Sequence, residues 1–483
     1  MARQREEHIE HLLRRAGFGA VEEDVVRLAD MPYVAAVDHL IRYDRVADDV
    51  DSKIGQPGHV GVTARAAGGF QPMVSIDDAR QRWLFRMVHS QRPLQEKMTL
   101  FWHNHFATAY SKINGTFGSA EAIRMMAAKP GEDPQRVLGQ IELLREHSLG
   151  NFRDLLVAVA KDPAMLVWLD GRTNVRGRPQ ENFARELMEL FTMGVGTFTE
   201  NDVYAGARAF TGWNLSRPQN AFYSFSYVPG QHDVDAKEFS FPIYTNGGRV
   251  IPARASSQGM QDGEELITAV ARHPATGPRL ATKLYQFFVN EADAPDAGLI
   301  NEISQIYYSS NFEIAPMVRR LLTSPQFHDQ RNWYKRYSWP VEFVARSLKE
   351  VGMNGFSLSN ALTPLINMGQ QIFEPPDVNG WELGRGWFST GGMLARMNFA
   401  AQLATNQKFN LRDLARADGK TPEALLSFVM ERLTPPEFAS SSYSALLDYA
   451  RAGITWNGSD DQLATKASGL VHLVVGSGDY QLV

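Results

Sequence analysis

The sequence contains no cysteine, and this absence excludes several kinds of chemistry. Disulfides, thiolate metal sites, iron–sulfur clusters and cysteine nucleophiles all require that side chain. A surplus of basic residues is also missing, since the formal net charge is -5. Proteins that bind nucleic acids usually carry such a surplus or a basic patch. We therefore expect no nucleic-acid partner, and any metal would be held by nitrogen and oxygen ligands.

Long apolar runs are absent as well. A membrane-spanning helix needs about 18 or more consecutive apolar residues, and the sequence has no such run. Residues 1–20 are charged and lack the apolar segment of a secretory signal. We therefore expect no membrane span and a cytoplasmic location, with a leader that has been removed as the alternative.

The common motifs of nucleotide and hydrolase chemistry are also missing. The sequence has no GxSxG, HExxH, P-loop or EF-hand pattern, and its glycines do not form a dinucleotide-binding fingerprint. ATP or NAD chemistry of the common kinds is therefore not expected.

Helical periodicity is present over most of the chain, and it predicts a mainly α protein, a multi-helical globular array. One stretch differs, because it alternates aromatic and polar residues and has few helix formers. It predicts a small irregular insertion with a β-hairpin that turns at Asn246-Gly247. The expected parts are N-terminal helices at 1–43, a long loop at 44–75, a main helical domain at 76–350 with the insertion at 216–262, an aromatic Gly/Pro-rich loop at 351–391, and C-terminal helices at 392–483 packed on the main domain.

One predicted helix, at residues 181–193, concentrates carboxylates. Glu181, Arg185 and Glu189 recur every four residues and form one polar stripe. Carboxylates at this spacing form either a solvated ladder or a metal site inside a helical bundle. Glu186 lies at the flank of the stripe, beside apolar residues. We expect an interior helix in which Arg185 and Glu186 pair with side chains of other segments.

Three histidines could complete such a site. Residues 99–106 read TLFWHNHF, and place His103 and His105 near the expected end of a helix. Positions two apart on a helix point about 200° apart, so both could bind one metal only at a frayed end. His232 precedes Asp233, and an imidazole near a carboxylate suits metal binding or general-base catalysis. The alternative for His103 and His105 is that one is a hydrogen-bonded core residue and the other a capping or surface group.

The loop before the helix at 181–193 carries polar residues of a different kind. Asp170, Arg172 and Asn174 lie in it, and Asn182 opens the helix. Because the N-terminus of a helix attracts anions, this loop is a candidate substrate site. The alternative is a simple surface turn.

Three motifs together resemble a known family. They are TLFWHNHF, the run QENFARELMELFTMGVGTFTENDVYAGARAFTGW at 180–213, and MGQQIFEPPDVNGW at 368–381. They resemble the large bacterial family of unknown function called DUF1800, and the resemblance covers most of the chain. It implies a mostly helical protein, and it names no reaction. The family pattern is matched at Glu181, Asn182, Arg185, Glu186 and Glu189.

Two functions follow from these residues. The first is a metal-dependent enzyme, either a hydrolase or a non-haem oxidoreductase, with Mg, Mn, Fe or Zn as the divalent metal and otherwise no cofactor. The second is a non-catalytic assembly or binding protein whose polar motifs are buried structural networks. In either case the partner is a small molecule, a peptide or a protein. The predicted roles are catalytic for Glu186, His232 and Arg185, substrate-binding for Asp170, Arg172, Asn174 and Asn182, and metal-binding for His103, His105, Glu181, Glu189 and Asp233.

Overall fold

The computed structural model describes residues 2–133, 136–218, 221–436, 438–453 and 455–483. These residues form 24 α-helices and two antiparallel sheets of two strands each. The prediction of a mainly α, multi-helical array with a small hairpin insertion is therefore confirmed. No helix in the described part of the chain combines the length and the apolar character that a bilayer crossing would need.

The elements fall into three groups along the chain. The helices before the insertion are α1 (Ala2–Ala16), α2 (Glu22–Ala29), α3 (Tyr33–Ile41), α4 (Ile76–His89), α5 (Pro93–His105), α6 (Tyr110–Phe117), α7 (Ser119–Ala127), α8 (Gln140–Glu146), α9 (Phe152–Lys161), α10 (Pro163–Trp168), α11 (Asn182–Glu186) and α12 (Glu200–Ala209). The strands are β1 (Trp213–Ser216), β2 (Ser224–Tyr227), β3 (Lys237–Glu238) and β4 (Val250–Ile251). The helices after the insertion are α13 (Met260–Arg272), α14 (Thr276–Phe288), α15 (Ala297–Ser309), α16 (Ile314–Leu322), α17 (Pro325–His328), α18 (Pro340–Val351), α19 (Ser359–Asn367), α20 (Thr390–Asn406), α21 (Lys408–Ala415), α22 (Pro422–Leu433), α23 (Ser440–Arg451) and α24 (Asp460–Val475).

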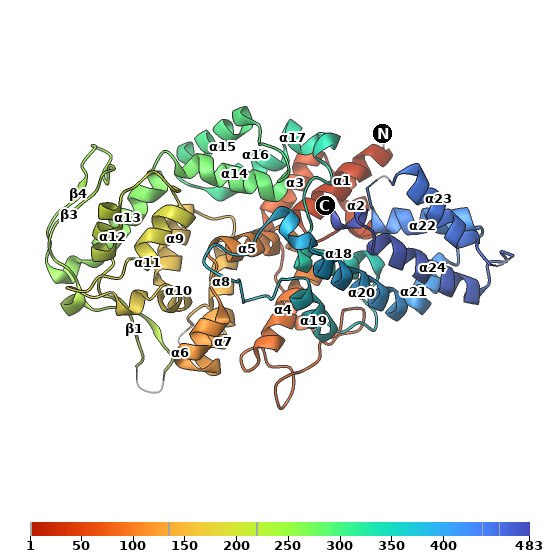
Figure 1. The fold of residues 1–483 in the computed structure, drawn as a ribbon, viewed down its shortest axis with the longest axis horizontal. Helices are drawn as coiled ribbons and strands as arrows, with labels where there is room; N and C mark the ends of the chain where they lie inside the picture. Colours follow the sequence, from red (N-terminus) through yellow and green to blue (C-terminus); the bar gives the residue numbers. More distant parts are fainter. Residues whose placement is uncertain (1, 134–135, 219–220, 437, 454) are drawn as a thin grey trace.

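The molecule is elongated, with the strands at one end and helices α21 to α24 at the other (Figure 1). Helices α4, α5 and α18 lie between these ends, and α4 packs against both of the others. Their large apolar side chains are fully buried, as Trp83, Trp102 and Phe343 illustrate. This central region brings segments from the first and last thirds of the chain together.

The insertion at 216–262 holds β2, β3 and β4, and β1 ends where it begins. In the first sheet, β1 pairs with β2 so that Trp213 lies opposite Tyr227, and in the second β3 pairs with β4. Asn246-Gly247 lies in the turn between β3 and β4, where the Gly247 N–H donates to the Tyr244 carbonyl at 3.1 Å. Gly247 has a φ of +88°, a conformation that favours glycine. The predicted position of the hairpin turn is therefore confirmed.

The expected aromatic loop at 351–391 contains one helix that the sequence analysis missed. Helix α19 buries Ala361 and Leu365, which are four residues apart and so share one face. Pro364 lies inside this helix, and the many Gly and Pro residues around it obscured the helical period. The rest of the segment is irregular and anchored by aromatic side chains, since Trp381 and Trp387 are both buried.

Candidate functional site

The five residues predicted as metal ligands lie in separate parts of the structure. His103 and His105 are on α5, whereas Glu181 and Glu189 flank α11. Asp233 is held by Arg208, whose Nε and Nη2 donate to the two carboxylate oxygens at 2.9 Å each. Among the described residues, no three His, Asp or Glu side chains form a group that could hold a metal ion. The expected convergence of these ligands is thus not observed among the described residues.

The helix predicted at 181–193 changes its hydrogen-bonding pattern halfway. It starts as α11 and continues as η4 (Leu187–Phe191), a π-helical turn. The Met193 N–H donates to the Met188 carbonyl at 2.9 Å, a five-residue spacing. Such turns are rare and frequently occur at functional sites. This turn directs the carbonyl of Phe191 toward α5, as described below.

The polar stripe of this helix lies at the surface rather than in the interior. The Arg185 side chain is 31% exposed and pairs with Glu181 at 3.2 Å and with Glu200 at 2.7 Å. Only the apolar side of the helix faces the core, so the expected interior position of the stripe was wrong. Pairing of Arg185 with another segment is confirmed, because Glu200 is on α12. Burial, and then repulsion by Glu189, raise the pKa of Glu186.

Because the stripe is exposed, Arg185→Ala is expected to have little effect on stability. Exposed ion pairs contribute little, so the Tm should stay within about 2 °C of the wild-type value. Thermal unfolding followed by circular dichroism measures this shift. A loss of more than about 5 °C would show that the stripe has a structural role that its exposure does not suggest.

The loop before α11 brings together two of the four predicted substrate-binding residues. The Asn182 Nδ2 donates to Asp170 Oδ2 at 3.3 Å, and Lys112 Nζ donates to the same oxygen at 3.2 Å. Asn174 is buried instead, where its Nδ2 donates to the Ala207 carbonyl at 2.8 Å. The guanidinium of Arg172 lies over the ring of Phe117, with 5.6 Å to the ring centroid. Asn174 and Arg172 therefore support the loop rather than present donors to a ligand.

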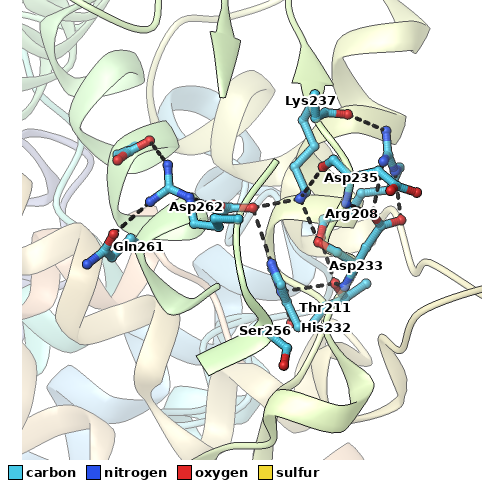
Figure 2. A network of polar contacts seen from close by, with 12 residues as sticks. Arg208, Thr211, His232, Asp233, Asp235, Lys237, Ser256, Gln261 and Asp262 are labelled. Carbon is cyan, nitrogen blue, oxygen red and sulfur yellow. Dashed lines mark hydrogen bonds and ion pairs between the residues drawn. The ribbon is translucent and has the colours of Figure 1, made fainter. Parts of the chain in front are cut away.

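His232 belongs to a buried polar network around Asp262 (Figure 2). The carboxylate of Asp262 receives Lys237 Nζ at 2.6 Å and His232 Nε2 at 3.2 Å, and it lies 2.8 Å from Arg254 Nε. On its other side, His232 Nδ1 lies 2.8 Å from the Thr211 carbonyl. The side chains of His232, Lys237 and Asp262 are fully buried. Because these side chains are buried and pair with one another, the geometry supports a structural role better than general-base catalysis.

His103 points into an aromatic enclosure within the core. Its ring meets the rings of Trp83, Phe373 and Trp381 edge-on, at centroid distances between 5.4 and 5.9 Å. Neither ring nitrogen has a hydrogen-bond partner among the described residues. Burial lowers the pKa of His103 to about 3, so the ring is neutral.

His105 lies two residues after His103 and links α5 to two other helices. Its Nε2 lies 3.1 Å from the carbonyl of Phe191 at the end of the π-helical turn. Its Nδ1 lies 3.1 Å from Nζ of Lys283 on α14. A neutral ring satisfies both contacts when Nε2–H donates to the carbonyl and Nδ1 accepts from the lysine. Burial, and then the nearby Lys283, lower the pKa of His105, which keeps it neutral.

Lys283 opens onto a cavity of about 140 Å³. Its walls come from four segments that are far apart in the sequence: the end of α5, α14 with Glu291 just after it, the segment containing Arg336 and Trp339, and the loop at 379–383. The apolar part of the wall is largely aromatic and includes Phe101 and Trp381. A cavity that combines aromatic walls with polar and charged groups has the character of a small-molecule site.

The loop at 379–383 is held onto α5 by a close backbone approach. The Trp381 N–H donates to Asn104 Oδ1 at 2.7 Å. Gly380 has a φ of +84°, and a Cβ at this position would lie 2.5 Å from the Asn104 carbonyl oxygen. Only glycine satisfies both conditions. Because Oδ1 of Asn104 is occupied, its Nδ2 donors are left for a ligand in the cavity.

The charges around the cavity are unbalanced. Lys283 is half-buried and pairs with no carboxylate in the described part of the chain. Burial, and then repulsion by Arg279, lower its pKa to about 8. The other charged residues of the wall are Arg336 and Glu291. The wall therefore carries more positive than negative charge.

Glu291 is the one acidic residue of the cavity wall. Its Oε1 accepts a hydrogen bond from the Tyr337 N–H at 2.6 Å. Burial raises the pKa of Glu291, although Arg336 opposes that effect. The cavity consequently favours an anionic occupant over a cationic one.

The sequence analysis missed Lys283, although the sequence carries a signal for it. On amphipathic α14, Arg279, Lys283 and Gln286 recur at spacings of four and three residues, so they lie on one face. That stripe was not singled out because it lies outside the three conspicuous motifs. Those motifs do converge here: TLFWHNHF supplies Asn104 and His105, and the segment 368–381 supplies the wall containing Trp381. The motif at 180–213 contributes the carbonyl that fixes His105.

The comparison with family models gave one match. A model described as "Protein of unknown function (DUF1800)" matches residues 11–482. Neither the curated proteins nor the solved structures yielded a match to the chain.

Proposed function

The chain belongs to the DUF1800 family, and we propose that it is an enzyme that binds a small organic anion in the Lys283 cavity and acts on it by acid–base chemistry. The observation that supports this proposal is the contact of 3.1 Å between Lys283 Nζ and His105 Nδ1 at the edge of the cavity. A half-buried ammonium group without a carboxylate partner loses part of its hydration, and an anionic ligand would offset that cost.

The pair is suited to hold and move a proton. With a pKa of about 8, Lys283 is present both as ammonium and as free amine near neutral pH. General acid–base catalysis is most efficient when the pKa of the group lies near the working pH. His105 is held in one tautomer by the Phe191 carbonyl, so its Nδ1 accepts the hydrogen bond from Nζ and fixes the position of the amine. The pair thus offers a donor and an acceptor of fixed geometry.

The metal-dependent mechanism keeps the status of a prediction. The residues that the sequence suggested as ligands do not form a group that could hold a divalent metal among the described residues. Elemental analysis of the purified protein tests it directly, and a stoichiometric metal would favour a metal-dependent hydrolase or oxidoreductase. The cytoplasmic location and the lack of nucleic-acid binding also stay predictions.

A second candidate function is a non-catalytic assembly or binding protein. Several ion networks support it because they are fully buried and join distant segments. One example is Glu96, which accepts from Arg86 at 2.8 Å and from Arg145 at 2.9 Å in the core. Such networks often specify a structure without taking part in chemistry.

Lys283→Met is expected to weaken the binding of a small carboxylate at least about tenfold, since the variant loses a charge-assisted contact. Isothermal titration calorimetry with lactate and acetate measures the Kd. For the wild type, binding should weaken as the pH rises through about 8, because Lys283 then loses its positive charge. Lys112→Met is the control, because Lys112 is a half-exposed lysine near Asp170, outside the cavity.

Two results would contradict the proposal. One is that the wild type binds neither carboxylate. The other is that Lys283→Met binds them as tightly as the wild type does, whereas Lys112→Met does not. The second result would move the anion site to the loop around Asp170, where the sequence analysis had placed it.

A further inference from the structure

We propose that Lys283 is a nucleophile that forms an imine with the carbonyl carbon of a small 2-oxo acid. This inference rests on the proposed function, because it places the substrate in the same cavity. It goes further in naming the substrate class and the atom of the protein that reacts.

The surroundings of Lys283 Nζ favour an attacking amine. A lysine that pairs with a carboxylate is held as ammonium, which has no lone pair for attack. Lys283 has no such partner among the residues that the structure describes, and its one side-chain contact is to the neutral ring of His105. That contact engages a single N–H and fixes the position of Nζ. The lone pair of the free amine is therefore available to a substrate in the cavity.

The polar groups of the wall favour a carbonyl compound that also carries a carboxylate. The positive charge of Arg336 in the wall attracts the carboxylate. The Nδ2 donors of Asn104, left over from the contact with Trp381, can hold an oxygen of the substrate. A volume of about 140 Å³ limits the substrate to a few carbon atoms. A short 2-oxo acid meets the three conditions of charge, hydrogen bonding and size.

The reaction balances without a further reactant. The lone pair of Lys283 Nζ attacks the carbonyl carbon, a C–N bond forms, and the carbonyl π electrons move onto oxygen. One proton passes from nitrogen to that oxygen, which gives a carbinolamine. The C–O bond then breaks, the second N–H proton leaves with the hydroxyl group as water, and the product is the imine. His105 Nδ1 accepts the hydrogen bond that aligns Nζ for attack.

Reductive trapping tests the inference on the full chain. The protein is incubated with pyruvate and sodium cyanoborohydride, and intact-mass and peptide mass spectrometry then locate the product. We expect one reduced pyruvate adduct per chain, at Lys283, formed faster as the pH rises through about 8 because the free amine is the reacting form. Lys112→Met should be labelled like the wild type.

Lys283→Arg provides the matched variant, because it keeps the positive charge and removes the nucleophilic amine. It should bind lactate within about fivefold of the wild-type Kd, a cost of about 1 kcal/mol, and form no adduct. If the wild type binds lactate but gives no adduct at Lys283, the inference is overturned and the proposed anion site stands. If lactate does not bind and no adduct forms, both fail. An adduct spread over several surface lysines would also overturn the inference.

Discussion

Glu342→Gln is expected to lower the free energy of unfolding by about 3–5 kcal/mol, because it leaves two buried cations without their counter-charge. Glu342 accepts from Lys97 and, at 2.7 Å, from Arg336, and all three side chains are almost completely buried. Its Oε2 also accepts the Trp339 N–H at 2.9 Å at the start of α18. The glutamine keeps the shape of the side chain and removes only the charge.

Urea denaturation monitored by tryptophan fluorescence measures the loss. Glu302→Gln is the control, since Glu302 forms a comparable bidentate pair with Arg320 on the surface and should change stability little. A similar loss in both variants would show that the effect does not come from burial.

The effect of Glu342→Gln should also depend on pH. Burial alone would raise the pKa of Glu342, but Arg336 and then Lys97 outweigh it and lower the pKa to about 2. In the unfolded chain the pKa is about 4.3. The ionised carboxylate therefore stabilises the fold fully above about pH 4.3, and this contribution is lost as the pH falls toward 2. The difference between wild type and variant should shrink over the same range, and a difference that stays constant down to pH 2 would contradict the ion-pair explanation.

Asp262→Asn is expected to destabilise the fold by a similar amount, about 3–5 kcal/mol. The carboxylate lies 2.6 Å from Lys237 Nζ and 2.8 Å from Arg254 Nε, and Lys237 has no exposed surface through which to regain water. The insertion depends on this contact, because Lys237 is in β3 and Asp262 is in α13.

Hydrogen exchange should show which part of the chain loses protection in Asp262→Asn, and we expect the segment around β3 and β4 to open first. Glu265→Gln is the matched control, since Glu265 also pairs with Arg254 but is 31% exposed. Equal denaturation midpoints for Asp262→Asn and the wild type would show that the network contributes no stability.

The sequence predicted the helices and the hairpin turn because both depend on short-range order. A period of 3.6 residues marks an amphipathic helix such as α14, and Asn246-Gly247 marks a turn, whatever the rest of the chain does. The exposed position of Arg185 could not be predicted in the same way. Helical spacing places Glu181 and Arg185 on one face, but only packing decides whether that face meets solvent or a neighbouring helix.

The candidate site was harder still to predict, because its key contacts leave no local pattern. His105 was singled out from its motif, yet its partners are a backbone carbonyl of Phe191 and the side chain of Lys283, 178 positions away in the sequence. Every residue has the same backbone carbonyl, so no sequence motif could indicate that contact. Lys283 has an ordinary position on an amphipathic helix, and its pKa is lowered by burial and then by Arg279.

The composite wall of the Lys283 cavity ties ligand binding to the integrity of the whole chain. Its parts come from Phe101 to His105, from α14, from Arg336 and from the loop ending at Leu383, so no short fragment contains them all. A ligand that binds only the assembled wall stabilises the native state relative to every partly folded form. In the cell, the concentration of that ligand would then set how long the protein resists proteolysis. The amount of the protein would therefore rise and fall with the concentration of its ligand.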